Sequence, residues 1–268
     1  MQIDGKQIAE ELYAALAPRF SLLGRKVRLG IVVVGHNPVI ESFVRIKTRS
    51  AERLGIEMVR ISLPEEATQE EVIAAVRKSA VETDAVIAQL PVPKHIDTNA
   101  VLAAIPPEKD VDALNPIVAD EERPVHAPVA LAVVEILQRG GIEIAGKRVV
   151  VVGEGRLVGK PAAWLLRSLG AEVSIFSLEQ GSIEDLKDAD IVVSGAGNPG
   201  FIKPEHLKED VALVDAGTSE LNKKITGDID PACADKASLY TPVPGGVGPV
   251  AVAMIFRNLL DLLEKASK

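Results

Sequence analysis

Residues 148–161 read RVVVVGEGRLVGKP, the segment that is most informative about the fold. A nearly continuous run of valine over 148–152 is typical of a strand buried on both faces of a parallel sheet. Gly153, Gly155 and Gly159 follow, and a helical pattern begins at about Lys160. This context suits a dinucleotide-binding loop, because glycines let the backbone approach a pyrophosphate and a helix N-terminus offers free N–H groups. The glycine spacing is one residue longer than the commonest fingerprint, and a plain tight turn is the alternative.

Strand-like and helix-like segments alternate on both sides of this loop. Apolar runs predict further strands over 29–34, 85–90, 173–176, 191–193 and 212–214. Helical periodicity predicts helices over 40–54, 69–81, 128–138, 160–169 and 250–263. Such alternation predicts an α/β fold with parallel sheets and crossover helices.

A proline-rich stretch over 106–128 interrupts this alternation and is interpreted as a loop or interdomain connection. We therefore expect two domains. The first spans 1–124 and is completed by the C-terminal helix over 250–268, while the second spans 125–249 and holds the glycine loop.

The composition narrows the possible functions. The chain has 268 residues, 47% of them hydrophobic, and a net charge of −8, which argues against a nucleic-acid or anionic-membrane partner. Its one cysteine, Cys233, excludes an intrachain disulfide, and its four histidines lie too far apart for metal-ligand spacing. Neither a signal peptide nor an apolar run of about 18 residues is found, so we expect a cytoplasmic protein without a metal site.

Lys47 occupies an unusual position in the helix predicted over 40–54. At about 100° per residue, it falls in the middle of an apolar face formed with Ile40, Phe43 and Val44. The other charged residues fall on the opposite side. Desolvation lowers the pKa of a lysine and makes it a usable general base, whereas the alternative is a lysine whose stem extends along the protein to water.

Four motifs, in order and spread nearly end to end, resemble the methylenetetrahydrofolate dehydrogenase/methenyltetrahydrofolate cyclohydrolase family of FolD type. They are Gln89-Leu-Pro-Val-Pro93, Lys109-Asp-Val-Asp112, the loop over 153–161 and Thr241-Pro-Val-Pro-Gly-Gly-Val-Gly-Pro249. The resemblance implies an N-terminal α/β folate domain and a C-terminal Rossmann domain that binds NADP or NAD. It also implies that the C-terminal helix returns to the first domain, and that the protein forms a homodimer.

The resemblance also implies roles for individual residues. Lys47 matches the catalytic lysine, Gln89 its polar partner, and Asp112 the carboxylate that binds the amino-bearing edge of the pterin. Phe43, Pro91, Gly245 and Gly246 match positions beside the folate. Positions that match the dinucleotide site are Gly153, Glu154, Gly155, Arg156, Val158, Gly159, Ser177, Gly197 and Gly217.

The implied chemistry has two steps. The methylene carbon of 5,10-methylenetetrahydrofolate gives a hydride to the nicotinamide, which leaves the methenyl form. Water then adds to the methenyl carbon, the ring opens to 10-formyltetrahydrofolate, and Lys47 serves the proton transfers.

Several positions depart from the family pattern. The family tyrosine is Phe43, so the hydroxyl partner of the lysine is lost, and the glycine after the Asp-Val-Asp motif is Ala113. Glu154 and Gly155 replace the arginine and serine associated with the NADP 2′-phosphate. Because Glu154 would repel that phosphate, we expect weakened selectivity for NADP.

Two other functions fit parts of the sequence. A related two-domain dehydrogenase of shikimate-dehydrogenase type would share the architecture but should lack the motif over 241–249. A folate- or dinucleotide-binding protein without catalysis is favoured by Phe43 and disfavoured by the retained Lys47, Gln89 and Asp112.

Overall fold

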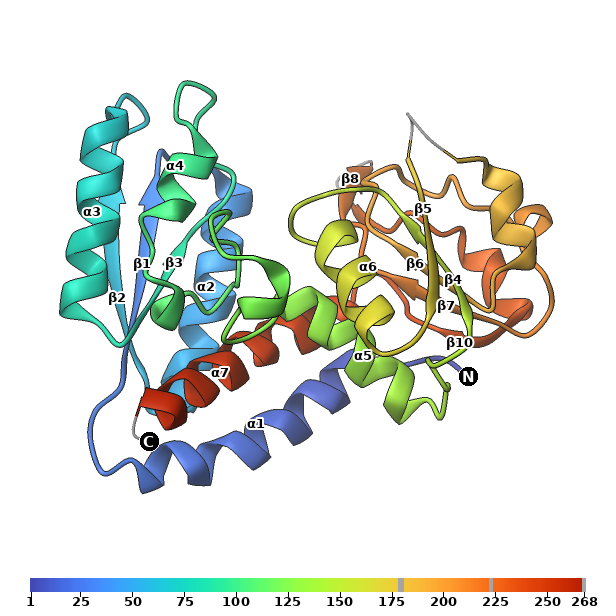
Figure 1. The fold of residues 1–268 in the computed structure, drawn as a ribbon, viewed down its shortest axis with the longest axis horizontal. Coiled ribbons are helices and arrows are strands. Elements are labelled where there is room, and N and C mark those ends of the chain that lie inside the picture. The colour runs from blue at the N-terminus through green and yellow to red at the C-terminus, as the bar shows by residue number, and fades with distance from the viewer. Residues whose placement is uncertain (178–180, 222–223, 267–268) are drawn as a thin grey trace. The chain divides into compact units, whose positions relative to one another are not determined.

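The computed structural model describes residues 1–177, 181–221 and 224–266, which form two compact units. Unit 1 contains residues 1–10 and 129–254, and unit 2 contains residues 11–128 and 255–268. Each unit is built around its own parallel sheet with helices beside it (Figure 1). The predicted two-domain α/β class is therefore confirmed.

The sheet of unit 2 has three parallel strands in the order β2-β1-β3. The central strand β1 (Arg28–Val34) is buried beyond its first residue, as its Val/Ile composition predicts. Its neighbours are β2 (Glu57–Leu63) and β3 (Ala85–Ala88). The strand predicted over 85–90 ends two residues early, where the chain approaches Pro91, which has no N–H for a ladder.

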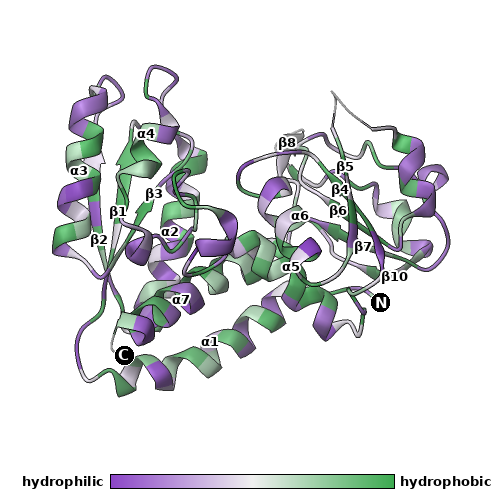
Figure 2. Ribbon diagram, viewed as in Figure 1, coloured by the Kyte–Doolittle hydropathy of each residue, from purple (hydrophilic) through white to green (hydrophobic). Residues whose placement is uncertain are grey.

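Helices α2 (Pro38–Arg53) and α3 (Gln69–Glu82) connect the strands of unit 2. The start of α3 is fixed by a capping box, in which the side chains of Thr68 and Glu71 each accept a hydrogen bond from the backbone N–H of the other. Val72 and Val76 of α3 pack in one core with Val32 and Val86 of the sheet. Figure 2 shows β1 and β3 as mainly hydrophobic, beside helices of mixed hydropathy.

Two long helices, α1 (Gly5–Leu22) and α7 (Val247–Ala266), contribute residues to both units. Within unit 2, the side-chain amide of Asn258 on α7 donates to the carbonyls of Val111 and His126, at 2.8 Å each. The C-terminal helix therefore returns to the first domain, as predicted. The alternation of strands and helices did not predict α1, which contains Pro18, or the short helix α4 (Thr98–Ala103).

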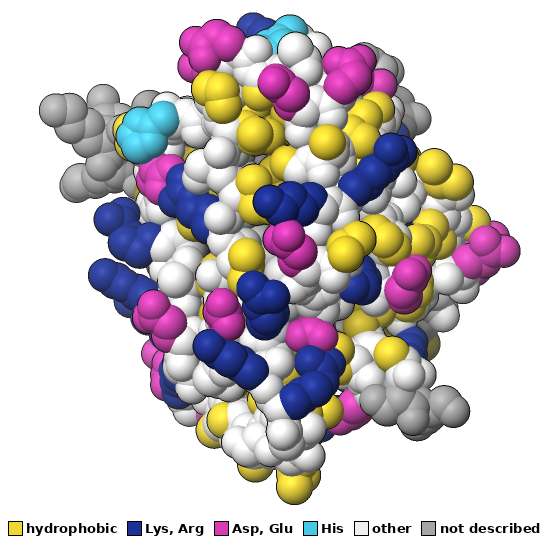
Figure 3. All heavy atoms as spheres, turned by 90° about the vertical axis from the view of Figure 1, so that its left-hand side faces the viewer, with side chains coloured by type: hydrophobic (Ala, Val, Ile, Leu, Met, Phe, Trp, Pro, Cys, Tyr) yellow, Lys and Arg dark blue, Asp and Glu magenta, His cyan; other side chains and the backbone are white. Residues whose placement is uncertain are grey.

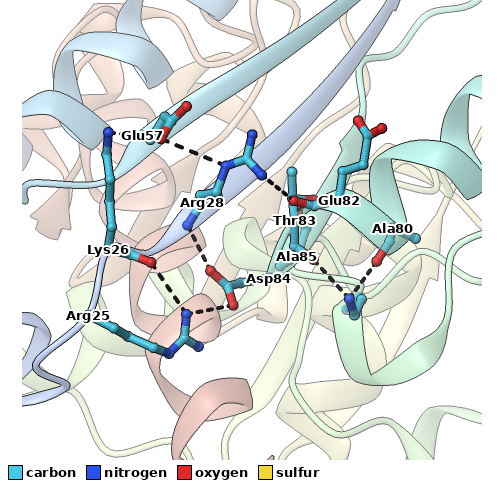
Figure 4. Close-up of polar contacts among 10 residues, drawn as sticks. Arg25, Lys26, Arg28, Glu57, Ala80, Glu82, Thr83, Asp84 and Ala85 are labelled. Atoms are coloured by element: carbon cyan, nitrogen blue, oxygen red, sulfur yellow. Dashed lines mark hydrogen bonds and ion pairs between the residues drawn. The ribbon is translucent and has the colours of Figure 1, made fainter.

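Charged side chains join the amino-terminal ends of β1 and β3 (Figure 4). The carboxylate of Asp84 accepts from the backbone N–H of Arg28 at 2.7 Å and pairs with Arg25 at 2.8 Å. Glu57 pairs with Lys26 at 2.9 Å. Partly exposed pairs of this kind stabilise a fold only modestly.

The sheet of unit 1 has five parallel strands in the order β10-β7-β6-β4-β5. They are β4 (Arg148–Val152), β5 (Glu172–Phe176), β6 (Ile191–Ser194), β7 (Val211–Asp215) and β10 (Ala237–Tyr240). The first four agree with the predicted strands to within one residue at each end. The fifth, β10, is short and was not predicted.

Helices, 3₁₀ turns and a hairpin complete the described chain. Unit 1 contains α5 (Pro128–Arg139, whose first residue falls in unit 2), α6 (Gly159–Ser168), the hairpin of β8 (Ser219–Leu221) and β9 (Lys224–Thr226), and 3₁₀ turns at Ile183–Asp188, Pro204–His206 and Pro231–Asp235. The proline-rich stretch holds 3₁₀ turns at Pro107–Lys109 and Asp120–Glu122 and is otherwise irregular.

The first ten residues group with unit 1, whereas the predicted first domain begins at residue 1. They do so because the chain start lies along β10. The N–H of Ile3 donates to the carbonyl of Tyr240 at 2.8 Å, and the N–H of Tyr240 donates to the carbonyl of Met1 at 2.9 Å.

Basic and acidic side chains are interspersed on the face shown in Figure 3. This mixing accords with the modest negative net charge. Among the described residues, no helix is both long and apolar enough to cross a membrane.

Candidate functional site

The side chains of Lys47 and Gln89 meet at the carboxyl edge of the sheet in unit 2. Lys47 lies on α2, which follows β1, and Gln89 directly follows β3. The Nζ of Lys47 donates to Oε1 of Gln89 at 3.0 Å. Because the strand order reverses between β1 and β3, this edge is where open α/β sheets bind ligands.

The amide of Gln89 is oriented by its own surroundings. Gln89 is buried, and its Nε2 donates to the carbonyl of Leu90 at 2.7 Å. This contact leaves Oε1 as the atom that faces Lys47, so Gln89 presents an acceptor and no donor to the amine.

Asp112 interacts electrostatically with the same lysine. Burial lowers the pKa of the half-buried Lys47 amine, and the charge of Asp112 opposes that shift. Burial also raises the pKa of Asp112, and the charge of Lys47 opposes that shift in turn. A lysine with a lowered pKa has more of its neutral amine near neutral pH, which is the form that accepts a proton.

The loop that carries Asp112 is held by Asp110. Oδ2 of Asp110 accepts from the backbone N–H groups of Leu114 and Asn115, at 2.8 Å each, while its buried Oδ1 has no hydrogen-bond partner. Burial raises the pKa of Asp110 to about 6, and the charge of Asp112 adds to the shift. Arg123 also holds the loop through the carbonyl of Ala113, at 2.8 Å.

Replacing Asp110 by Asn should alter the dependence of stability on pH. Because the folded pKa of Asp110 is about 6, against an ordinary 3.8, the folded protein holds this proton more tightly than the unfolded chain does. Stability that the protonated group provides below pH 4 is therefore lost as the pH rises through 6, by up to about 3 kcal/mol. In denaturant unfolding, the free energy of unfolding of the wild type relative to that of Asp110→Asn should be smaller at pH 7.5 than at pH 4.5. The same difference in free energy of unfolding between the two proteins at both pH values would contradict this.

Ala113 adopts a left-handed backbone conformation, with φ of 54°. A side chain is strained there, and glycine is not. We expect Ala113→Gly to raise the free energy of unfolding by about 0.5–1 kcal/mol, after the greater flexibility of glycine in the unfolded chain is counted. Ala104→Gly is the matched control, because Ala104 has a φ of −80° and its replacement by glycine should destabilise the protein. Thermal unfolding should show a higher melting temperature than wild type for Ala113→Gly and a lower one for Ala104→Gly.

The other residues expected beside the folate in unit 2 are exposed. Phe43 is 44% exposed although it lies one turn before Lys47, whereas Ile40 and Val44 of the same face are buried. Pro91 is also exposed and follows a cis peptide bond. The two exposed side chains therefore have surface available to a ligand.

Gly245 and Gly246 lie in unit 1 and differ in their surroundings. Gly245 has a φ of 112°, and a Cβ there would face open space. A Cβ added to Gly246 would lie 2.7 Å from the carbonyl oxygen of Pro242. The carbonyl oxygen of Gly246 is itself so close to Gly5 that a Cβ added to Gly5 would lie 1.7 Å from it. Gly245 is thus the more open of the two.

The glycine loop of unit 1 has the geometry of a dinucleotide site. Gly153 has a φ of 96°, which makes the tight turn after β4. A Cβ on Gly159 would lie 1.9 Å from the carbonyl oxygen of Gly153, so only glycine lets α6 start this close to the strand. Around Gly155, the nearest atom to a Cβ would be the carbonyl oxygen of Gly195, at 3.9 Å. These are the roles of the three fingerprint glycines, so the residues present fit a pyrophosphate.

The remaining predicted cofactor residues lie along the carboxyl edge of the same sheet. Glu154, Arg156 and Val158 belong to the loop between β4 and α6, and Ser177 directly follows β5. Gly197 follows β6, and Gly217 follows β7. Residues 178–180, which follow Ser177, are outside the described residues.

Sequence reasoning missed four buried polar residues that shape these loops. They are Asp110, Asn115, Asp215 and Asp228. Asp110 belongs to the Lys109-Asp-Val-Asp motif, Asp215 lies two residues before Gly217, and Asp228 directly follows Gly227. An aspartate close to a glycine was the available signal, although it does not distinguish a buried acid from a solvated one.

The family models identify a known enzyme family. The model of the tetrahydrofolate dehydrogenase/cyclohydrolase catalytic domain matches residues 3–112, and that of its NAD(P)-binding domain matches residues 127–267. A curated relative, the bifunctional protein FolD of Halothermothrix orenii, is 38% identical over 96% of this chain and 95% of its own.

Solved structures agree with these matches. The FolD methylenetetrahydrofolate dehydrogenase/cyclohydrolase of Campylobacter jejuni superposes with a TM-score of 0.93 at 30% identity, over 99% of each chain. The Trypanosoma brucei FolD, solved with NADP cofactor and inhibitor, has a TM-score of 0.91 at 33% identity, covering 100% of this chain and 98% of its own.

Proposed function

The chain belongs to the tetrahydrofolate dehydrogenase/cyclohydrolase family, and we therefore propose that it performs both reactions of the family name. It oxidises 5,10-methylenetetrahydrofolate to the 5,10-methenyl form with NADP or NAD, and then hydrolyses that product to 10-formyltetrahydrofolate. The observation that carries the proposal is the 3.0 Å contact between Lys47 Nζ and Gln89 Oε1, at the ligand-binding edge of the sheet in unit 2.

Lys47 moves the protons of the hydrolytic step. Water adds to the methenyl carbon, a C–O bond forms, and the proton lost by the water passes to Nζ of Lys47. The hydroxyl left on the carbon then loses its proton as the formyl C=O bond forms, the C–N bond breaks, and the ring nitrogen takes the proton held by Lys47, so that one proton is released overall. Gln89 holds the amine through Oε1, and the lowered pKa of Lys47 leaves neutral amine available for the first transfer.

The folate is oriented by Asp112 and by apolar contacts. Asp112 accepts hydrogen bonds from the amino-bearing edge of the pterin, with its loop fixed by the bonds of Asp110. The exposed ring of Phe43 stacks on the folate, and Pro91 flanks it.

The dinucleotide binds in unit 1. Its pyrophosphate is held by the backbone of Gly153–Gly159 at the start of α6, and Gly197 and Gly217 border the rest of the site. When bound, it supplies the hydride acceptor for the oxidation.

A non-catalytic folate- or dinucleotide-binding protein is the second candidate. Phe43 favours it, because its phenyl ring offers Lys47 no hydroxyl partner. The contact between Lys47 and Gln89 favours the enzyme, since a binding protein has no need of a lysine with a lowered pKa.

Two absorbance assays test the proposal. The purified chain should form the methenyl absorbance from 5,10-methylenetetrahydrofolate plus NADP or NAD, and should accelerate decay of that absorbance when methenyltetrahydrofolate is added alone. Folate binding without either reaction would establish the non-catalytic candidate.

Assembly and domain roles complete the proposal. The folate domain over 1–124 with helix 250–268, and the dinucleotide domain over 125–249, work as a homodimer in the cytoplasm. Light scattering of the purified chain measures the mass of the assembly, and a monomer would contradict this part.

A further inference from the structure

A loop of unit 1 is wrapped around one buried carboxylate. Asp228 is fully buried and accepts four hydrogen bonds from the segment that ends β6 and follows it. Its Oδ2 accepts from Ser194 Oγ at 2.7 Å, from the N–H of Ala196 at 2.8 Å and from the N–H of Gly197 at 3.3 Å. Its Oδ1 accepts from the N–H of Asn198 at 2.7 Å.

Three of these donors are consecutive backbone N–H groups. Such runs form concave nests that bind anions, and here the anion is a side chain of the protein itself. Because Asp228 occupies the inside of the nest, it fixes the backbone of 195–198 in one conformation.

A second buried carboxylate fixes Asp228 in turn. Asp215, at the end of β7, is 1% exposed and accepts from the N–H groups of Gly217, Asp228 and Ile229 at 2.9, 3.2 and 2.9 Å. Its own N–H donates to Thr241 Oγ1 at 2.7 Å. The loops after β6 and β7 are therefore joined through two aspartates.

Two glycines leave space for the carboxylates of Asp215 and Asp228. A Cβ on Gly217, two residues after Asp215, would lie 2.4 Å from both carboxylate oxygens of Asp228. A Cβ on Gly227, one residue before Asp228, would lie 2.1 Å from Oδ2 of Asp215. Each carboxylate thus packs against the glycine that neighbours the other aspartate in sequence.

This arrangement lies at the ligand-binding edge of the sheet. The strand order of unit 1 reverses between β4 and β6, so the loops after these two strands flank the site where such sheets bind ligands. The two loops are in contact, because a Cβ added to Gly153 would lie only 3.0 Å from the carbonyl oxygen of Gly195. A shift of the segment held by Asp228 would therefore move one wall of the glycine loop.

We propose that Asp228 is a positioning residue for dinucleotide binding, which sets the loop over 195–198 directly and the loop over 215–217 through Asp215. The proposal rests on the proposed function, because it takes the ligand of this edge to be NAD or NADP. Asp228 itself does not touch the ligand, since its oxygens are occupied by the loop.

Asp228→Asn tests the proposal, because the amide keeps the shape but turns one acceptor into a donor that faces N–H groups. Fluorescence titration with NADH and NADPH should show at least tenfold weaker binding. Hydrolysis of methenyltetrahydrofolate without dinucleotide depends on Lys47, Gln89 and Asp112 of unit 2 and should stay within twofold of wild type. This split would not arise from a loss of stability throughout the chain.

Asp230→Asn is the matched control, because Asp230 is two residues away but pairs near the surface with Lys203, at 2.6 Å. Its dinucleotide affinity should not change. Ser194→Ala, which removes one of the four donors, should weaken binding by a few-fold and carries the test if Asp228→Asn does not fold. The proposal is overturned if a folded Asp228→Asn variant binds dinucleotide as tightly as the wild type. If Asp228→Asn does not fold, unchanged dinucleotide affinity in Ser194→Ala overturns it. A folded Asp228→Asn that loses dinucleotide binding and hydrolysis in parallel also overturns it. A wild-type chain that binds neither dinucleotide overturns the proposed function itself, and this inference with it.

Discussion

Lys47→Gln should lose hydrolysis of methenyltetrahydrofolate by at least about 100-fold, the usual minimum effect of removing a general acid–base group. Glutamine can still meet Gln89 by an amide–amide hydrogen bond, but it cannot accept the proton that water loses. Since hydride transfer needs no proton from this side chain, methylenetetrahydrofolate oxidation should persist. The two activities, measured separately, should therefore diverge in this variant.

Lys47→Arg is the control for charge. Arginine keeps the positive charge beside Asp112 but stays protonated, so it should also fail to hydrolyse the methenyl form. In the wild type, the rate of hydrolysis should rise with pH through a pKa below the ordinary 10.5 of lysine, because burial lowers the pKa of Lys47. Full activity in Lys47→Gln would show that the lysine merely extends its stem to water.

The second large effect concerns the choice of dinucleotide. We expect the wild-type chain to have no strong preference for NADP, because the acidic Glu154 lies in the loop that we propose to hold the dinucleotide. Glu154→Arg replaces repulsion of the 2′-phosphate by attraction and should raise kcat/KM for NADP by about 10- to 100-fold, which corresponds to about 1.4–2.8 kcal/mol. The value for NAD should change much less, since NAD has no charge at that position.

Glu154→Gln separates the two contributions to this change. It removes the negative charge without adding a positive one, and should give an intermediate gain for NADP. Raising the salt concentration should shrink the differences among the three proteins, because the interaction is between partly solvated charges. A strong NADP preference in the wild type would refute the assignment of Glu154.

The fold was predictable where the sequence pattern reflects burial directly. Strand β4 is a run of valines, and its predicted bounds agree with the structure because a strand buried on both faces has little room for polar residues. Helix α2 was predictable for a related reason, since Ile40, Val44 and Ala51 repeat at the helical period and are buried.

Other elements depend on contacts that a local pattern does not contain. Helix α1 contains Pro18 and contacts α7 through Tyr13 and Phe256, whose ring centroids lie 6.3 Å apart. These two residues are more than 240 positions apart in the sequence. Strand β10 has only four residues and joins the sheet through β7. Both are stabilised by distant parts of the chain.

The same contrast holds at the site. Lys47 was a candidate from the sequence alone, because one charge on an apolar helix face is visible in the periodicity, whereas Gln89 and Asp112 became candidates only through the family resemblance. Asp228 was not found, because its partners come from 194–198 and its neighbour Asp215 from another strand. A buried acid satisfied by backbone N–H groups has no signature in sequence spacing.

We propose that one chain oxidises and then hydrolyses the same folate. A single reaction of the purified chain with 5,10-methylenetetrahydrofolate and NADP or NAD, with the folate products separated by chromatography over time, tests both steps together. The proposed function predicts 10-formyltetrahydrofolate as the end product in the wild type and accumulated methenyltetrahydrofolate in Lys47→Gln. Recovery of unreacted methylenetetrahydrofolate with both dinucleotides, from a chain that binds it, would contradict the claim.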